Sequence, residues 1–153
     1  MKAFIFKFQK ILNIKKFKED EAKIELGRAI GVLTELENRI FSVGQERARA
    51  AAAQFGPGNN AQMIQQYMFY LVRLDNTKEQ LLKEAAMAEL KVEEARDVFL
   101  EASRERKVLD KLKEKKQKEH RKKMLAEDTK AIDDISASAQ VRRISMEQLD
   151  NLF

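Results

Sequence analysis

The sequence predicts an all-α protein, an antiparallel coiled-coil hairpin of two helices with a longer C-terminal helix. Apolar residues recur at alternating steps of four and three along two long stretches, which is the heptad pattern of coiled coils. One strong helix breaker, Gln54 to Asn60, separates the two stretches. The composition has 36% charged residues, one proline and no cysteine or tryptophan, which is typical of long helices.

The first helix is predicted over residues 1–55. From Ala22 to Val43 the heptad is regular, and traced backwards it weakens over the charged Lys15 to Glu21 and recovers in the aromatic N-terminus. There the pattern fits one face of a helix that carries Phe4, Phe8, Ile11 and Leu12.

A turn is predicted at residues 56–60. Gly56 suits the left-handed position after a helix, and Pro57 cannot continue one. Asn59 is expected to cap the next helix, with Gln62 three residues later completing a capping box. Two long heptad helices joined by so short a break fold back on each other most economically.

The second helix is predicted over residues 61–135. Its heptad positions are all apolar or aromatic except two, and they are Tyr67, Leu71, Leu74, Lys78, Leu81, Ala85, Ala88, Val92, Ala95, Phe99, Ala102, Arg106 and Leu109. Such a stripe needs a partner helix, which the first stretch supplies. Ser136 to Ala139 is expected to break the helix, leaving 136–153 as a flexible tail of a single domain, 1–153.

The residue inventory argues against an enzyme. His120 is the only histidine and lies among charged residues, where a solvated helix position is expected. Without cysteine, a second histidine or a phosphate-binding glycine loop, no catalytic set, metal site or cofactor site is predicted. No apolar run reaches the 18 or so residues that a membrane span needs. The function is therefore expected to be mechanical or recognitional.

Positive charge is concentrated in two places. Arg104 to Lys123 holds eleven basic and four acidic residues, and Met1 to Asp20 holds six lysines and two acidic residues. A hairpin brings both stretches to the same end, where they would form one positive surface.

Both ends of the chain resemble the FliJ family of bacterial flagellar export proteins. The resemblance rests on Phe4-x-Phe6-x-Phe8-Gln9-x-x-Leu12, on the run from Arg106 to Lys116, and on Asp133-Asp134-Ile135. The family usually has leucine where this chain has Phe8, and its basic run often has a Leu-Glu pair where Leu109-Asp110 stands. The segment after Ser136 matches no family pattern.

The resemblance implies a cytoplasmic, non-enzymatic component of the flagellar type III export apparatus, peripheral to the inner face of the cell membrane. Family members insert the end that carries both termini into the ring of the export ATPase FliI, contact the export gate protein FlhA, and bind free export chaperones. The expected ring-contact residues are Phe4, Phe6, Phe8, Arg106, Lys107, Lys111, Lys113, Lys115, Lys116, Lys122 and Lys123.

For the gate contact, the family pattern Gln-Gln-aromatic-x-x-x-Leu is matched by Gln65, Gln66, Tyr67 and Leu71, with Leu74 on the same face. Tyr67, Leu71 and Leu74 are also heptad positions, so packing alone would explain them. Tyr70, off the heptad, is the better candidate for a surface aromatic.

Two other functions fit the residues. A coiled-coil nucleic-acid binder would use the basic run, but interspersed acidic residues and the lack of interleaved aromatics argue against it, so no nucleic-acid partner is expected. A membrane-surface scaffold would use the Phe-rich N-terminus. Because the heptad stripe finds its partner within the chain, a monomer is expected for the free protein.

Overall fold

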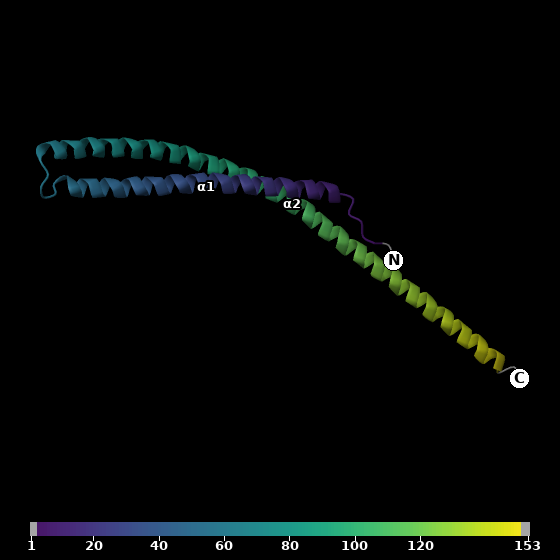
Figure 1. Ribbon diagram of the computed structural model, residues 1–153. Helices are drawn as coiled ribbons and strands as arrows, with labels where there is room; N and C mark the ends of the chain where they lie inside the picture. Colours follow the sequence, from purple (N-terminus) through teal and green to yellow (C-terminus); the bar gives the residue numbers. More distant parts are fainter. Residues whose placement is uncertain (1–2, 151–153) are drawn as a thin grey trace. The chain divides into compact units, whose positions relative to one another are not determined.

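The computed structural model describes residues 3–150, and it is 92% helical with no strand in that range. It contains two helices, α1 (Gln9–Gln54) and α2 (Ala61–Asp150), joined by residues 55–60 (Figure 1). The predicted all-α fold is therefore confirmed. The chain divides into two compact units, which we call the hairpin unit, Asn13–Arg106, and the basic unit, Met1–Leu12 with Lys107–Phe153.

In the hairpin unit, α1 and the first half of α2 run side by side in opposite directions (Figure 1). A buried cluster of Leu36, Leu81 and Ala88 forms its centre, with Leu33, Ile40, Val43 and Ala85 packed against it. All predicted heptad positions from Tyr67 to Arg106 are buried or half-buried, including Lys78 and Arg106. The heptad pattern thus identifies the packed faces correctly.

Ion pairs join the two helices of the hairpin unit along its length. Lys15 Nζ lies 2.5 Å from Glu105 Oε2, and Arg47 Nε lies 2.5 Å from Asp75 Oδ1. The side-chain hydrogen bond from Lys15 lowers the pKa of Glu105, and that from Arg47 lowers the pKa of Asp75. Both carboxylates therefore remain charged at neutral pH and favour the antiparallel pairing.

The turn differs from its predicted form. The left-handed residue is Gly58, with φ of 90°, and not Gly56. Asn59 closes α1, because its Nδ2 donates to the carbonyls of Ala53 and Gln54, at 2.8 and 3.0 Å. Asn60 caps α2, because its Oδ1 accepts from the amide of Met63 at 2.9 Å. Adjacent asparagines share the two caps, so the predicted Asn59–Gln62 box is wrong.

The start of the chain also differs from the prediction. Helix α1 begins at Gln9, and residues 3–6 are not helical. Phe6 is 7% exposed and Leu12 fully buried, whereas Phe8 and Ile11 are each 46% exposed. The predicted helical face with Phe4, Phe8 and Ile11 is therefore wrong. In a non-helical segment side chains alternate, so Phe6 is buried while Ile5 is exposed.

Helix α2 continues past the predicted end at residue 135 and through the predicted break at Ser136 to Ala139. The segment has no glycine or proline, and its serine hydroxyls can donate hydrogen bonds to backbone carbonyls of the same helix. Ser138 Oγ donates to the carbonyl of Ile135, and Ser145 Oγ to that of Val141. Within residues 3–150, neither helix is apolar enough over a sufficient length to cross a membrane.

Candidate protein-interaction site

A basic and aromatic surface lies on the basic unit, where the N-terminal segment packs against α2. The ring of Phe4 lies on that of His120, with centroids 5.6 Å apart and planes inclined by 58°. The rings of Phe6 and Phe8 meet edge to face at 5.8 Å. A shallow groove of about 550 Å³ beside them is lined by residues 3–8 and by Lys116, Glu119, His120 and Lys123.

Lysines are concentrated on the basic unit, and Lys7, Lys116 and Lys123 line the groove itself. Most are exposed and Lys113 is half-buried; the predicted members within the unit are Lys107, Lys111, Lys113, Lys115, Lys116, Lys122 and Lys123. Lys116 pairs with Glu119 at 2.9 Å, and Lys118 pairs with Glu114 at 2.6 Å. These hydrogen bonds lower the pKa of both glutamates. Ionised glutamates offset part of the charge, but the lysines outnumber them, so the surface is positive.

Arg106 does not belong to this surface. It lies in the hairpin unit, where its Nε donates to Glu19 Oε2, and both side chains are largely buried. The ion pair occupies a heptad position on each helix, which explains how two charged residues fit in an apolar stripe. Of the predicted ring-contact residues, Arg106 is thus the one that serves the packing of the hairpin.

Sequence reasoning missed His120 as a member of the basic surface. Its ring is half-buried against Phe4 rather than surrounded by water. One sequence pattern could have indicated this contact. Phenylalanine at residues 4, 6 and 8 is typical of an extended segment, whose aromatic side chains need packing partners on α2. Met124, which lines the neighbouring groove with Phe4 and Gln117, supplies another such contact.

The predicted gate residues lie in the hairpin unit, near the turn. Leu74 is 6% exposed, Tyr67 and Leu71 are half-buried, and Tyr70 is 39% exposed. The hydroxyl of Tyr70 lies 3.5 Å from Glu46 Oε2. Tyr67 and Tyr70 line a small pocket with Met63 and Gln66. Tyr70 is therefore the most accessible of the four, and Leu74 is a core residue.

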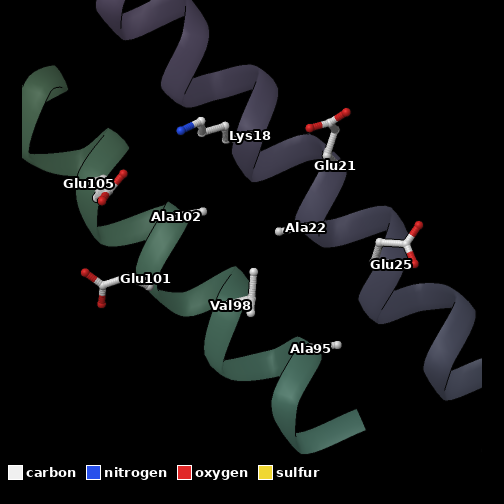
Figure 2. Close-up of a pocket in the computed structure, with 9 residues that line it drawn as sticks. All are labelled: Lys18, Glu21, Ala22, Glu25, Ala95, Val98, Glu101, Ala102 and Glu105. Atoms are coloured by element: carbon white, nitrogen blue, oxygen red, sulfur yellow. The ribbon is translucent and has the colours of Figure 1, made fainter. Parts of the chain in front are cut away.

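A second groove, in the hairpin unit, was not predicted. Its floor is apolar, and its rims carry four glutamates and one lysine, Lys18, as Figure 2 shows. The groove occupies about 610 Å³. Alanines at heptad positions are too small to fill the space between the two helices here. The floor of the groove consists of Ala22, Ala95, Val98 and Ala102. Glu21 and Glu25 stand on α1, and Glu101 and Glu105 on α2 (Figure 2). The alanines at heptad positions 22, 95 and 102 were the sequence signal for this opening.

Neither surface has the chemistry of a metal site, since no group of three or more metal-ligating side chains occurs in the part of the chain that the structure describes. The arrangement suits contacts with proteins, with charge and aromatic area concentrated on the basic unit.

Comparison with known proteins assigns the chain to a family. Residues 4–145 match the family described as Flagellar FliJ protein, which covers most of the 153 residues. No curated protein and no solved structure gives a significant match. The matched range includes α1, the turn and α2 as far as residue 145. The chain therefore belongs to the flagellar FliJ family and is a component of the flagellar export apparatus.

Proposed function

We propose that the chain is a non-enzymatic stalk that binds the ring of the export ATPase FliI through its basic unit, contacts the export gate FlhA through the hairpin unit, and escorts export chaperones. Membership of the family supports a role in the flagellar export apparatus. The resemblance of the N-terminus and of the basic run to FliJ proteins supports the assignment of FliI binding to the basic unit. The site of action is then the cytoplasmic face of the cell membrane.

One observation carries the ring contact. The N-terminal segment and the lysine-rich part of α2, far apart in sequence, pack together in one unit and share one groove. Exposed lysines give such a surface long-range attraction for an acidic partner. Exposed aromatic and aliphatic side chains beside them, such as Phe8 and Ile5, supply apolar area that favours close contact.

Binding to FliI tests this contact. The first variant reverses four exposed lysines of the basic unit, Lys115, Lys116, Lys122 and Lys123, to glutamate. The matched control reverses four exposed lysines of the hairpin unit, Lys16, Lys23, Lys83 and Lys91. Each set contains one lysine paired within its own helix, Lys116 with Glu119 and Lys83 with Glu79, so the net charge change and the lost ion pairs are equal.

We expect the first variant to raise the dissociation constant for FliI by roughly a hundredfold at low salt, because several charge-assisted contacts become repulsive. The control should change it by less than about threefold. Circular dichroism checks that both variants keep their helices. Equal losses in the two variants would mean that only net charge matters, and the proposed contact would be wrong.

The gate contact rests on Tyr70 and its exposed neighbours. Met68 and Phe69 are 56% and 67% exposed, so this stretch of α2 presents more apolar area than its packing uses. Tyr70→Ala should weaken binding to FlhA by roughly tenfold while leaving binding to FliI unchanged. Leu100→Ala, at a 43% exposed position elsewhere on α2, is the control. Unchanged FlhA binding by Tyr70→Ala would exclude this patch.

A further inference from the structure

The part of α2 that belongs to the basic unit has two different sides. On one side, the ring of Phe4 packs on His120, and Phe4 also shares a groove with Gln117 and Met124. We call this side the packed face. Its positions are half-buried or line the groove with Phe4, and they are Leu109, Lys113, Gln117, His120 and Met124.

The opposite side of α2 carries a row of lysines. Each of them lies two residues before a position of the packed face, and two residues turn an α-helix by about 200°. All of these lysines are exposed. They extend over about 22 Å of helix, at 1.5 Å per residue. We call this row the lysine face, and it consists of Lys107, Lys111, Lys115, Lys118 and Lys122.

The acidic residues of this part of α2 lie beside the lysine face and leave most of its charge unpaired. Glu114 and Glu119 line a shallow hollow of about 440 Å³ together with four of the five lysines. Glu114 pairs with Lys118 at 2.6 Å, whereas Glu119 pairs with Lys116, outside the face. Within the described range, Lys118 is therefore the one member of the lysine face that forms an ion pair.

The spacing of these lysines is unfavourable for the helix itself. Lys107 and Lys111 are four residues apart, and so are Lys111 and Lys115, and Lys118 and Lys122. Like charges at this spacing repel each other on a helix surface. An acidic partner would replace this repulsion by attraction. The arrangement thus favours the bound state of α2 over the free one.

We propose that the lysine face is the charged docking surface of the basic unit, and that it binds an acidic surface of a protein partner. This inference rests on the proposed function, in which the partner is the FliI ring. It assigns the charged contact to one side of α2. The lysines of the groove beside Phe4, which are Lys7, Lys116 and Lys123, then contribute less to binding.

A nucleic acid is a poorer occupant than an acidic protein surface. Glu114 and Glu119 line the same hollow as the lysines, and they would repel a continuous phosphate backbone. Residues 107–122 contain no phenylalanine, tyrosine or tryptophan on which bases could stack. A protein surface can instead place its acidic residues opposite the lysines and leave the glutamates uncontacted.

Neutralising the lysines of each side separately, with binding to FliI measured at low salt, tests this assignment. The face variant carries Lys111→Gln, Lys118→Gln and Lys122→Gln. The groove variant carries Lys7→Gln, Lys116→Gln and Lys123→Gln. All six lysines are exposed and belong to the basic unit. Each variant loses three charges and one ion pair within α2, Lys118 with Glu114 or Lys116 with Glu119.

The face variant should raise the dissociation constant for FliI roughly thirtyfold, and the groove variant roughly threefold, because the acidic surface meets only the lysine face directly. Arginine at the same three positions of the face keeps the charge and should restore binding to within about threefold of wild type. Equal losses in the face and groove variants would overturn the inference and leave FliI binding by the basic unit standing. No loss in either variant would contradict the proposed function as well.

Thermal unfolding followed by circular dichroism separates binding from folding. Because the face variant relieves repulsion between lysines, it should unfold at a temperature no lower than that of the wild-type chain. A lower unfolding temperature together with weaker binding would mean that the lysines act through the helix, and would overturn the inference. A short mixed-sequence DNA duplex serves as the competing polyanion. Tighter binding to this duplex than to FliI, lost in the face variant, would also overturn it.

Discussion

Phe4 and His120 pack ring against ring, with their centroids 5.6 Å apart, and so join the non-helical start of the chain to the lysine-rich part of α2. Phe6 and Leu12, in the same N-terminal part of the basic unit, are buried. The aromatic N-terminus is therefore both part of the packing of the basic unit and part of its candidate binding surface.

Phe6→Ala should release the N-terminal segment. The loss of a buried phenyl ring should cost about 2–3 kcal/mol locally, because the ring returns to water when the segment detaches. Amide hydrogen exchange of residues 9–12, at the start of α1, should become faster. Ile5→Ala, at an 83% exposed position, is the control and should leave exchange unchanged. Equal exchange in both variants would contradict the packing of Phe6.

Asn60→Ala should destabilise the hairpin by about 1 kcal/mol, because the amide of Met63 loses its capping acceptor. Gln62→Ala should change the free energy of unfolding by less than about 0.5 kcal/mol, since surface changes away from caps and cores have small effects. Urea denaturation measures both. A larger effect at Gln62 would favour the capping box expected from the sequence.

Much of the fold was predictable because heptad spacing reports directly which helix faces are buried. The pattern identified both long helices, the intervening turn and the packed positions from Tyr67 to Arg106. Helix ends were less predictable, because they depend on which of several similar residues makes the cap. Asn59 and Asn60 are chemically equal candidates, and only the path of the turn assigns one to each helix.

The candidate surface was predictable in its charge but not in its members. The lysine run and the aromatic start are visible in the sequence, and both lie in the basic unit. Arg106 was assigned to the surface because it begins the stretch that resembles the family, yet Glu19, far away in sequence, binds it in the hairpin unit. His120 was missed for the corresponding reason, since its contact with Phe4 depends on the non-helical path of residues 3–6.

Acid should destabilise the hairpin unit partly through Asp75. Its pKa is lowered in the folded chain by the hydrogen bond from Arg47, so the unfolded chain binds a proton more readily. The stabilisation is present above the ordinary carboxyl pKa and is lost as the pH falls through the lowered value. Asp75→Asn should therefore unfold at a temperature that depends less on pH in the acid range. An unchanged pH dependence in calorimetry would contradict this role.

Substitutions of Leu74 and of Tyr70 should differ in their effect on the free energy of unfolding. Leu74→Ala should lower the free energy of unfolding by about 2–4 kcal/mol, because the side chain is 6% exposed and its loss leaves a cavity. Tyr70→Ala should cost less than about 1 kcal/mol, since the side chain is partly in water. Chemical denaturation compares them, and equal losses would mean that Tyr70 is a core residue and a poor candidate for a partner contact.

The central claim, that the basic unit engages the export ATPase, is tested most directly by the rate of ATP hydrolysis by FliI as the chain is added at low salt. We predict that the wild-type chain and the control with Lys16, Lys23, Lys83 and Lys91 reversed both stimulate hydrolysis and ring formation. The variant with Lys115, Lys116, Lys122 and Lys123 reversed should stimulate neither. No stimulation by the wild-type chain, or equal stimulation by all three proteins, would contradict the account.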